Sequence, residues 1–155
     1  MADCSGHGCC VCWMMLREVN IDSLYETKSR GFSQAVIVEM RPPAMIQSGV
    51  GFISGMVAWD TDRRIPQDID IGEETTLAMQ NVVRLLRAES REVQSIVQVR
   101  TFVVNLTPEL ARTVSRALEV FFTETAHRPA STMVGVTGLA APEVRVEIEV
   151  VFSTH

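Results

Sequence analysis

Strand-like and helix-like periodicities alternate along this chain, and their order is the feature that most limits how it can fold. Apolar residues recur every three or four positions in two segments, which predicts amphipathic helices at Ile71–Glu89 and Pro108–Phe122. Four other segments are rich in β-branched and apolar residues and predict strands: Phe32–Met40, Gly49–Trp59, Ser95–Val104 and Glu143–Phe152. The order β-β-α-β-α-β predicts an α+β fold in which two helices cover one face of a mixed sheet.

The last predicted strand alternates most regularly. One face carries Val144, Val146, Ile148 and Val150, and the other carries Arg145, Glu147, Glu149 and Val151. Glu147 and Glu149 therefore share a face, where each carboxylate is either solvated or held in a pocket. Burial in an apolar pocket raises the pKa of a carboxyl group toward neutrality, which suits a general acid or base.

The N-terminal segment has a different composition from the rest of the chain. The first twelve residues contain all four cysteines and one histidine: Cys4, Cys9, Cys10, Cys12 and His7. A disulfide framework is therefore excluded. The thiols could bind a soft metal ion, but they lack the paired Cys-x2-Cys spacing of a structural zinc site. We expect residues 1–15 to be a disordered tail, residues 16–155 to form one domain, and the domain to hold no metal.

Composition argues against several classes of protein. Lys and Arg number 14 against 19 Asp and Glu, and the resulting net charge of −5 and single tyrosine disfavour nucleic-acid binding. The most apolar segment, Gly49–Val57, is about half as long as the roughly 20 residues of a membrane helix. No secretory signal is recognisable at the start. We therefore expect a cytoplasmic protein that does not insert into membranes.

Short catalytic motifs are absent from the chain. It contains no G-x-S-x-G, H-E-x-x-H or P-loop sequence. His127 and His155 have no nucleophile at a recognisable spacing, so we expect both to be surface residues.

Several motifs between Phe32 and Phe152 together resemble the YjgF/Rid family of reactive intermediate deaminases. They occur in unbroken order at Phe32–Ala35, Phe52–Gly55, Asn81–Leu86, Val99–Val104, Phe121–Phe122, Arg128–Thr132 and Val146–Glu149. The resemblance implies a chorismate-mutase-like domain that forms a homotrimer around a central barrel. It also implies ligand pockets in the clefts between subunits and chemistry that needs no cofactor.

The same resemblance assigns roles to individual residues. Glu147 matches the family glutamate that positions the attacking water, and Ser54 with Gly55 matches a serine and glycine of the pocket. Gln34 also follows the family pattern. Two positions depart from it, because Phe32 replaces a pocket tyrosine and Ser115 replaces an asparagine on the second helix.

The most consequential departure concerns an arginine that follows Pro-Ala in the deaminase branch and clamps the carboxylate of a 2-imino acid. Here that position is Ser131, and Thr132 and Met133 follow it. A serine cannot form the bidentate, charge-assisted contact of a guanidinium group with a carboxylate. Arg128 either takes over this contact or is an exposed loop residue.

These residues predict a pocket that is less cationic and more apolar than that of the deaminase branch. We expect an enzyme that adds water to an imine, an enamine or a related compound other than a simple 2-imino acid, with Glu147 as the general acid or base. The alternative is a trimeric module that binds a metabolite or a protein without turnover. The net charge of −5 disfavours ribonuclease activity.

Overall fold

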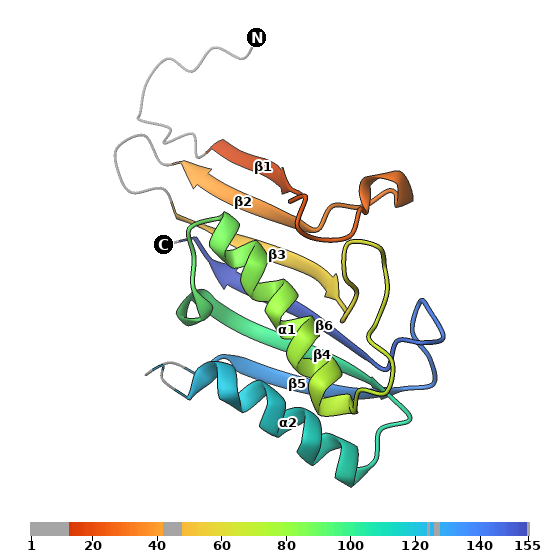
Figure 1. Ribbon diagram of the computed structural model, residues 1–155. Coiled ribbons are helices and arrows are strands. Elements are labelled where there is room, and N and C mark those ends of the chain that lie inside the picture. Colours follow the sequence, from red (N-terminus) through yellow and green to blue (C-terminus); the bar gives the residue numbers. More distant parts are fainter. Residues whose placement is uncertain (1–12, 42–47, 124, 126–127, 155) are drawn as a thin grey trace, which may run out of the picture.

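The computed structural model describes residues 13–41, 48–123, 125 and 128–154. These residues form one six-stranded sheet and two α-helices (Figure 1). The strands are β1 (Trp13–Val19), β2 (Ala35–Arg41), β3 (Ser48–Met56), β4 (Ile96–Val104), β5 (Ala130–Val136) and β6 (Val146–Ser153), and the helices are α1 (Ile71–Ala88) and α2 (Pro108–Phe122). Two 3-10 turns, Lys28–Arg30 and Val93–Ser95, complete the regular structure.

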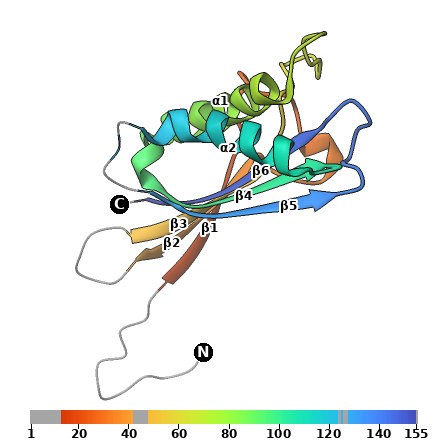
Figure 2. The same ribbon diagram turned by 90° about the horizontal axis from the view of Figure 1, so that it is seen from below.

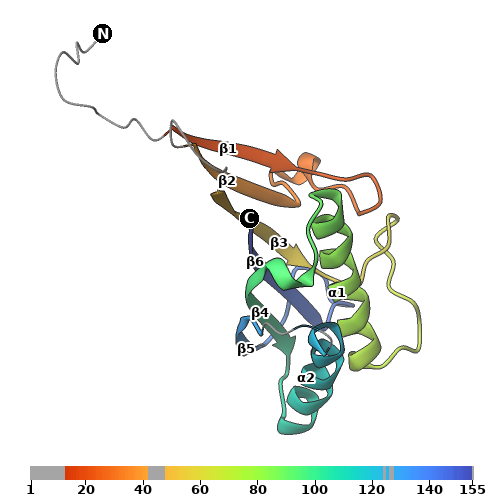
Figure 3. The same ribbon diagram turned by 90° about the vertical axis from the view of Figure 1, so that its left-hand side faces the viewer.

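The strand order in the sheet is β1-β2-β3-β6-β4-β5. Only β4 and β5 run parallel, and they are joined through α2, whereas the other neighbours are antiparallel. Both helices lie on the same face of the sheet (Figure 2), and α1 runs along β3 and β6 beside α2 (Figure 3). The predicted α+β class, the mixed sheet and the placement of the helices are confirmed.

Local sequence determines where the helices begin. Asp70 and Glu73 form a reciprocal capping box at the start of α1, so two backbone N–H groups that lack helical partners are satisfied. At the start of α2, the Thr107 side chain accepts a hydrogen bond from the Leu110 N–H, and Pro108 occupies the first helical position. The apolar stripes of both helices pack against the sheet and enclose the core.

Alternation along β6 follows the prediction. Val146, Ile148, Val150 and Phe152 are buried beneath the helices, whereas the residues between them point to the opposite, helix-free face of the sheet. We call this second face the open face. On β4 the alternation shifts at Val97, because a bulge lies between Ile96 and Gln98 in the pairing with β6. Regular alternation from Ser95 to Val104 would put Val97 on the buried face with Val99, but Val97 is 49% exposed as a result of the bulge.

Two strands were missed by the sequence analysis, and both lie at the edges of the sheet. β1 begins at Trp13, so it includes three residues that we had placed in the tail. β5 lies beside β4, and its residues are exposed or half-buried, which removes the apolar alternation by which a strand is recognised. The four cysteines and His7, His127 and His155 fall outside the described residues.

Candidate functional site

Glu147 lies on the open face, in the middle of the sheet. It is directly opposite Phe102 of β4, and Phe102 is in turn opposite Val134 of β5. Residues directly opposite in a ladder point to the same face. The Glu147 side chain is half-buried, and the side chains directly opposite it on β4 and β5 are apolar.

Gly55 of β3 forms the wall against which Glu147 rests. The ladder between β3 and β6 is irregular between Ile53 and Met56, and Gly55 lies within this irregular stretch. A methyl group added at position 55 would overlap the Glu147 carboxylate. The absence of a side chain at Gly55 thus creates the space that the carboxylate occupies.

Tyr25 supports this wall from behind. Its side chain is only 2% exposed, and its hydroxyl donates a hydrogen bond of 3.1 Å to the Gly55 carbonyl oxygen. The ring meets the Trp59 ring edge to face at 5.2 Å, and the Arg63 guanidinium lies over both rings. Burial raises the pKa of Tyr25 to about 12, so this residue remains a neutral donor near pH 7.

The surroundings of Glu147 favour its protonated form. Burial raises the pKa of the Glu147 carboxyl above its usual range, and the negative charge of Glu149 raises it further. Arg100, opposite Glu149 on β4, forms an ion pair with Glu149 at 2.9 Å. An elevated pKa is the property expected of a carboxyl group that exchanges protons with a reacting molecule.

Ser54 and Phe32 differ in how freely their side chains could contact a ligand. The Ser54 hydroxyl donates a 2.7 Å hydrogen bond to the Ser33 carbonyl oxygen, so its proton is already committed and it can serve a ligand only as an acceptor. Phe32, next to Ser33, is 43% exposed. Gln34 is buried and holds the preceding loop through hydrogen bonds to Ile21 and Tyr25, which is a structural role.

The remaining predicted site residues are not gathered around Glu147 within one chain. Ser131 and Met133 are opposite the buried Val99 and Thr101, so they point to the helix-bearing side of the sheet. Thr132 points to the open face.

Two further predicted residues also lie away from Glu147. Ser115 is exposed on α2, in the helix layer. Arg128 is exposed, and its guanidinium donates to the carbonyl and the hydroxyl oxygen of Thr125. Within one chain, the residues that the family places around its ligand are thus divided between the two faces of the sheet.

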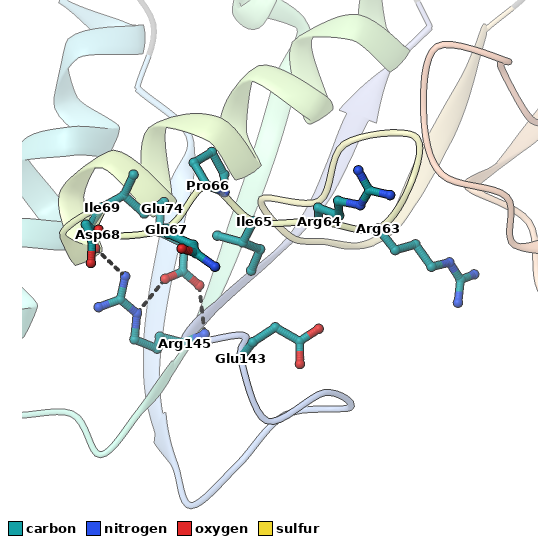
Figure 4. A pocket seen from close by; sticks show the side chains of 10 residues that line it. All are labelled: Arg63, Arg64, Ile65, Pro66, Gln67, Asp68, Ile69, Glu74, Glu143 and Arg145. Carbon is teal, nitrogen blue, oxygen red and sulfur yellow. Dashed lines mark hydrogen bonds and ion pairs between the residues drawn. The ribbon is translucent and has the colours of Figure 1, made fainter.

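A separate pocket of about 720 Å³ lies under the loop of residues 63–69 (Figure 4). Its floor contains Glu74, which is fully buried and accepts hydrogen bonds from Arg145 Nε and from the backbone N–H groups of Arg145 and Val146. Arg145 also donates to the Ile69 carbonyl oxygen. This pair anchors α1 to the start of β6, so we assign it to the scaffold.

Among the residues that the structure describes, no group of three His, Cys, Asp or Glu side chains could hold a metal ion. The same residues contain no helix long and apolar enough to cross a membrane.

Sequence reasoning missed Tyr25 and the link between Arg100 and Glu149. Tyr25 is the single tyrosine of the chain, but it lies in a loop with no periodicity to place it. Alternation along Ser95–Val104 puts Arg100 on the same face as Phe102, but only the pairing of β4 with β6 brings Arg100 opposite Glu149.

A six-stranded mixed sheet with two helices on one face is the α+β fold of YjgF-like, chorismate-mutase-like domains. The sequence model of the endoribonuclease L-PSP family matches residues 31–153, and the chain belongs to this family. No curated protein matches the chain. The resemblance to the YjgF/Rid family is therefore confirmed.

Solved structures agree with this assignment. YyfB of Yersinia pestis, described as a protein of unknown function of the conserved Rid family, is 28% identical with a TM-score of 0.63, and the match covers 88% of this chain and 97% of that one. The YjgF gene product of E. coli is 22% identical with a TM-score of 0.69 and the same coverage. Yeast Mmf1 is 23% identical with a TM-score of 0.71, covering 89% and 98%. The last two similarities concern the fold alone.

Proposed function

We propose that this protein hydrolyses a neutral or bulky imine or enamine, with Glu147 as the residue that activates water. The observation that carries the proposal is a half-buried carboxyl group of raised pKa that rests on Gly55 beside an apolar row. In the reaction, Glu147 takes a proton from water as the oxygen attacks the C=N carbon, and returns it to the nitrogen. The hydroxyl proton of the tetrahedral adduct then passes to the nitrogen as the C–N bond breaks, which gives a carbonyl compound and releases ammonia or an amine.

The preference for a substrate without a carboxylate follows from Ser131. The resemblance places a clamping arginine at this position in the deaminase branch, whereas Arg100 near Glu147 and the more distant Arg128 both have other partners. Arg100 pairs with Glu149, and Arg128 donates to Thr125. Hydrogen bonds to charged groups contribute about 1.5–3 kcal/mol, so a carboxylate should bind at least about tenfold more weakly here than in a site with the clamp.

A homotrimer is part of the proposal. The open face carries exposed apolar side chains, among them Leu16 (65%), Phe52 (49%) and Val134 (38%), and such a surface is typical of a protein interface. In a trimer, β5 of a neighbouring copy could bring Ser131 to Met133 toward Glu147. We expect light scattering to give three times the chain mass, and a monomer would contradict this arrangement.

The test of catalysis is a panel of neutral and carboxylate-bearing imines, assayed with wild-type protein and with Glu147→Gln. We expect wild-type protein to accelerate hydrolysis of the neutral imines and the variant to lose at least about a hundredfold in kcat/KM. Equal rates for the two proteins would disprove the role of Glu147. RNA in the same panel tests for ribonuclease activity, which the net charge disfavours.

The second candidate function is a binding module without turnover, and the serine at position 131 is the observation that favours it. If neither protein turns over any substrate but ligands raise the melting temperature, this alternative holds. Ser131→Arg separates the two further: in an otherwise intact catalytic site it should raise turnover of 2-imino acids by about tenfold to a hundredfold. In a pure binding module it should change affinity for carboxylates only.

A further inference from the structure

We propose that Arg100 and Glu149 form a charge pair that sets the protonation of Glu147, which makes Arg100 a positioning residue for this site. This proposal deepens the proposed function. Only the expected effect of the charge pair on activity rests on that function. The electrostatic part concerns three side chains of one sheet face, and it can be measured without any substrate.

The geometry of the open face places these groups together. Arg100 and Glu149 are opposite each other on β4 and β6, and Arg100 Nη2 lies 2.9 Å from Glu149 Oε2. Glu149 follows Glu147 by two residues on the same face, so their Cα atoms are about 7 Å apart along the strand. The side chains of Arg100 and Glu149 are 50% and 33% exposed, so solvent weakens their fields without removing them.

The strands on either side of Glu147 present no charged side chain at its own level of the sheet. β4 presents Phe102, and β3 presents Gly55, which has no side chain. Tyr25 behind Gly55 is neutral, and the Arg63 guanidinium lies over its ring at 5.9 Å from the centroid. Arg145, two residues before Glu147, is paired with the buried Glu74, its Nε lying 2.6 Å from Glu74 Oε2. Among the described residues, the charged groups on the other side of Glu147 are Arg100 and Glu149.

The pair acts on Glu147 with a definite sign. A carboxylate at Glu149 opposes ionisation of Glu147, and the Arg100 cation offsets it. Between dielectric constants of 80 and 20, two charges about 7 Å apart shift a pKa by about 0.4 to 1.7 units. Removing Arg100 should therefore make Glu147 hold its proton to higher pH, and removing Glu149 should make it release the proton at lower pH.

The test is a titration of the Glu147 side-chain carboxyl by carbon-13 NMR, with the resonance assigned through its loss in Glu147→Gln. We expect the midpoint to rise by at least about 0.4 units in Arg100→Gln and to fall by a similar amount in Glu149→Gln. The double variant should lie between them, and Arg100→Lys should stay near wild type. Arg87→Gln, which removes the same charge from an exposed ion pair at the end of α1, should leave the midpoint unchanged.

Shifts of the same sign in both single variants, or shifts no larger than that of Arg87→Gln, would overturn the proposal. If Arg100→Gln does not fold, Glu149→Gln still decides, because an unchanged midpoint there contradicts the claim. The acid limb of the pH profile of activity should move with the NMR midpoint. If the midpoint moves and the activity profile does not, the charge pair stands and the catalytic role of Glu147 fails.

Discussion

Gly55→Ala provides the sharpest structural test of how Glu147 is held. The added Cβ would lie 2.5 Å from Glu147 Cδ, whereas carbon atoms in contact are about 3.5–4.0 Å apart. The carboxyl group must therefore move by at least about 1 Å, unless β3 itself shifts. Overpacking of this kind costs about 1–3 kcal/mol, which corresponds to a fall in melting temperature of about 2–12 °C for a chain of this size.

The assay is a double-mutant cycle of melting temperatures, in which Glu147→Ala removes the side chain that Gly55→Ala would strike. We expect Gly55→Ala to lower the melting temperature of the wild-type protein but to have little effect when Glu147 is already alanine. Gly138→Ala is the matched control, because its Cβ would meet no atom within 4 Å. If Gly55→Ala lowers the melting temperature equally in the wild-type protein and in Glu147→Ala, the added methyl group does not clash with Glu147 and the reasoning is refuted. In an active protein, a displacement of about 1 Å should also lower kcat/KM by about a hundredfold.

Three further predictions concern the support of the site and its charge. Tyr25→Phe removes the hydrogen bond to the Gly55 carbonyl and should lower the free energy of unfolding in urea by about 1–2 kcal/mol; no change would show that water replaces the hydroxyl. Glu74→Ala leaves Arg145 without its buried partner and should cost about 3–5 kcal/mol in the same assay, whereas the exposed Glu109→Ala should have no measurable effect. Glu147→Gln should melt at a higher temperature than the wild-type protein at pH 7, and the two melting temperatures should converge near pH 4. A difference in melting temperature that stays constant between these pH values would contradict the raised pKa of Glu147.

The sign of the last prediction follows from linkage between protonation and folding. Because folding raises the pKa of Glu147, the folded protein binds the proton more tightly than the unfolded chain does. The ionised carboxylate therefore opposes folding above its folded-state pKa, and this cost disappears at low pH, where both states are protonated. A residue that reduces stability at neutral pH is consistent with a functional rather than a structural role.

The parts of the fold that the sequence predicts are those with a strong local signal. Asp70 and Thr107 cap helices that continue with apolar stripes, and β6 alternates because one of its faces packs against those helices. β1 and β5 have no such signal, since each lies at an edge and is held mainly by one neighbouring strand. Edge strands depend on tertiary pairing, which local periodicity does not record.

The candidate site is only partly visible in the sequence for a similar reason. The pattern marks both Glu147 and Glu149 as acidic residues on one face of an otherwise apolar strand, and the family resemblance is what singles out Glu147. The support by Tyr25 joins residues 30 positions apart, and the space at Gly55 exists only because β3 and β6 pair with an irregular register. The commitment of the Ser54 proton to Ser33 likewise depends on the packing of a loop against a strand.

The pH dependence of kcat/KM for a neutral imine tests the central claim most directly. After subtraction of the uncatalysed rate, we expect the activity of the wild-type protein to fall toward low pH with a midpoint above about 4.3, the ordinary pKa of glutamate, because Glu147 must be ionised to accept the proton of water. Glu147→Gln should lose this limb together with the activity. A profile that is flat through this range, or a limb that persists in Glu147→Gln, would contradict the account.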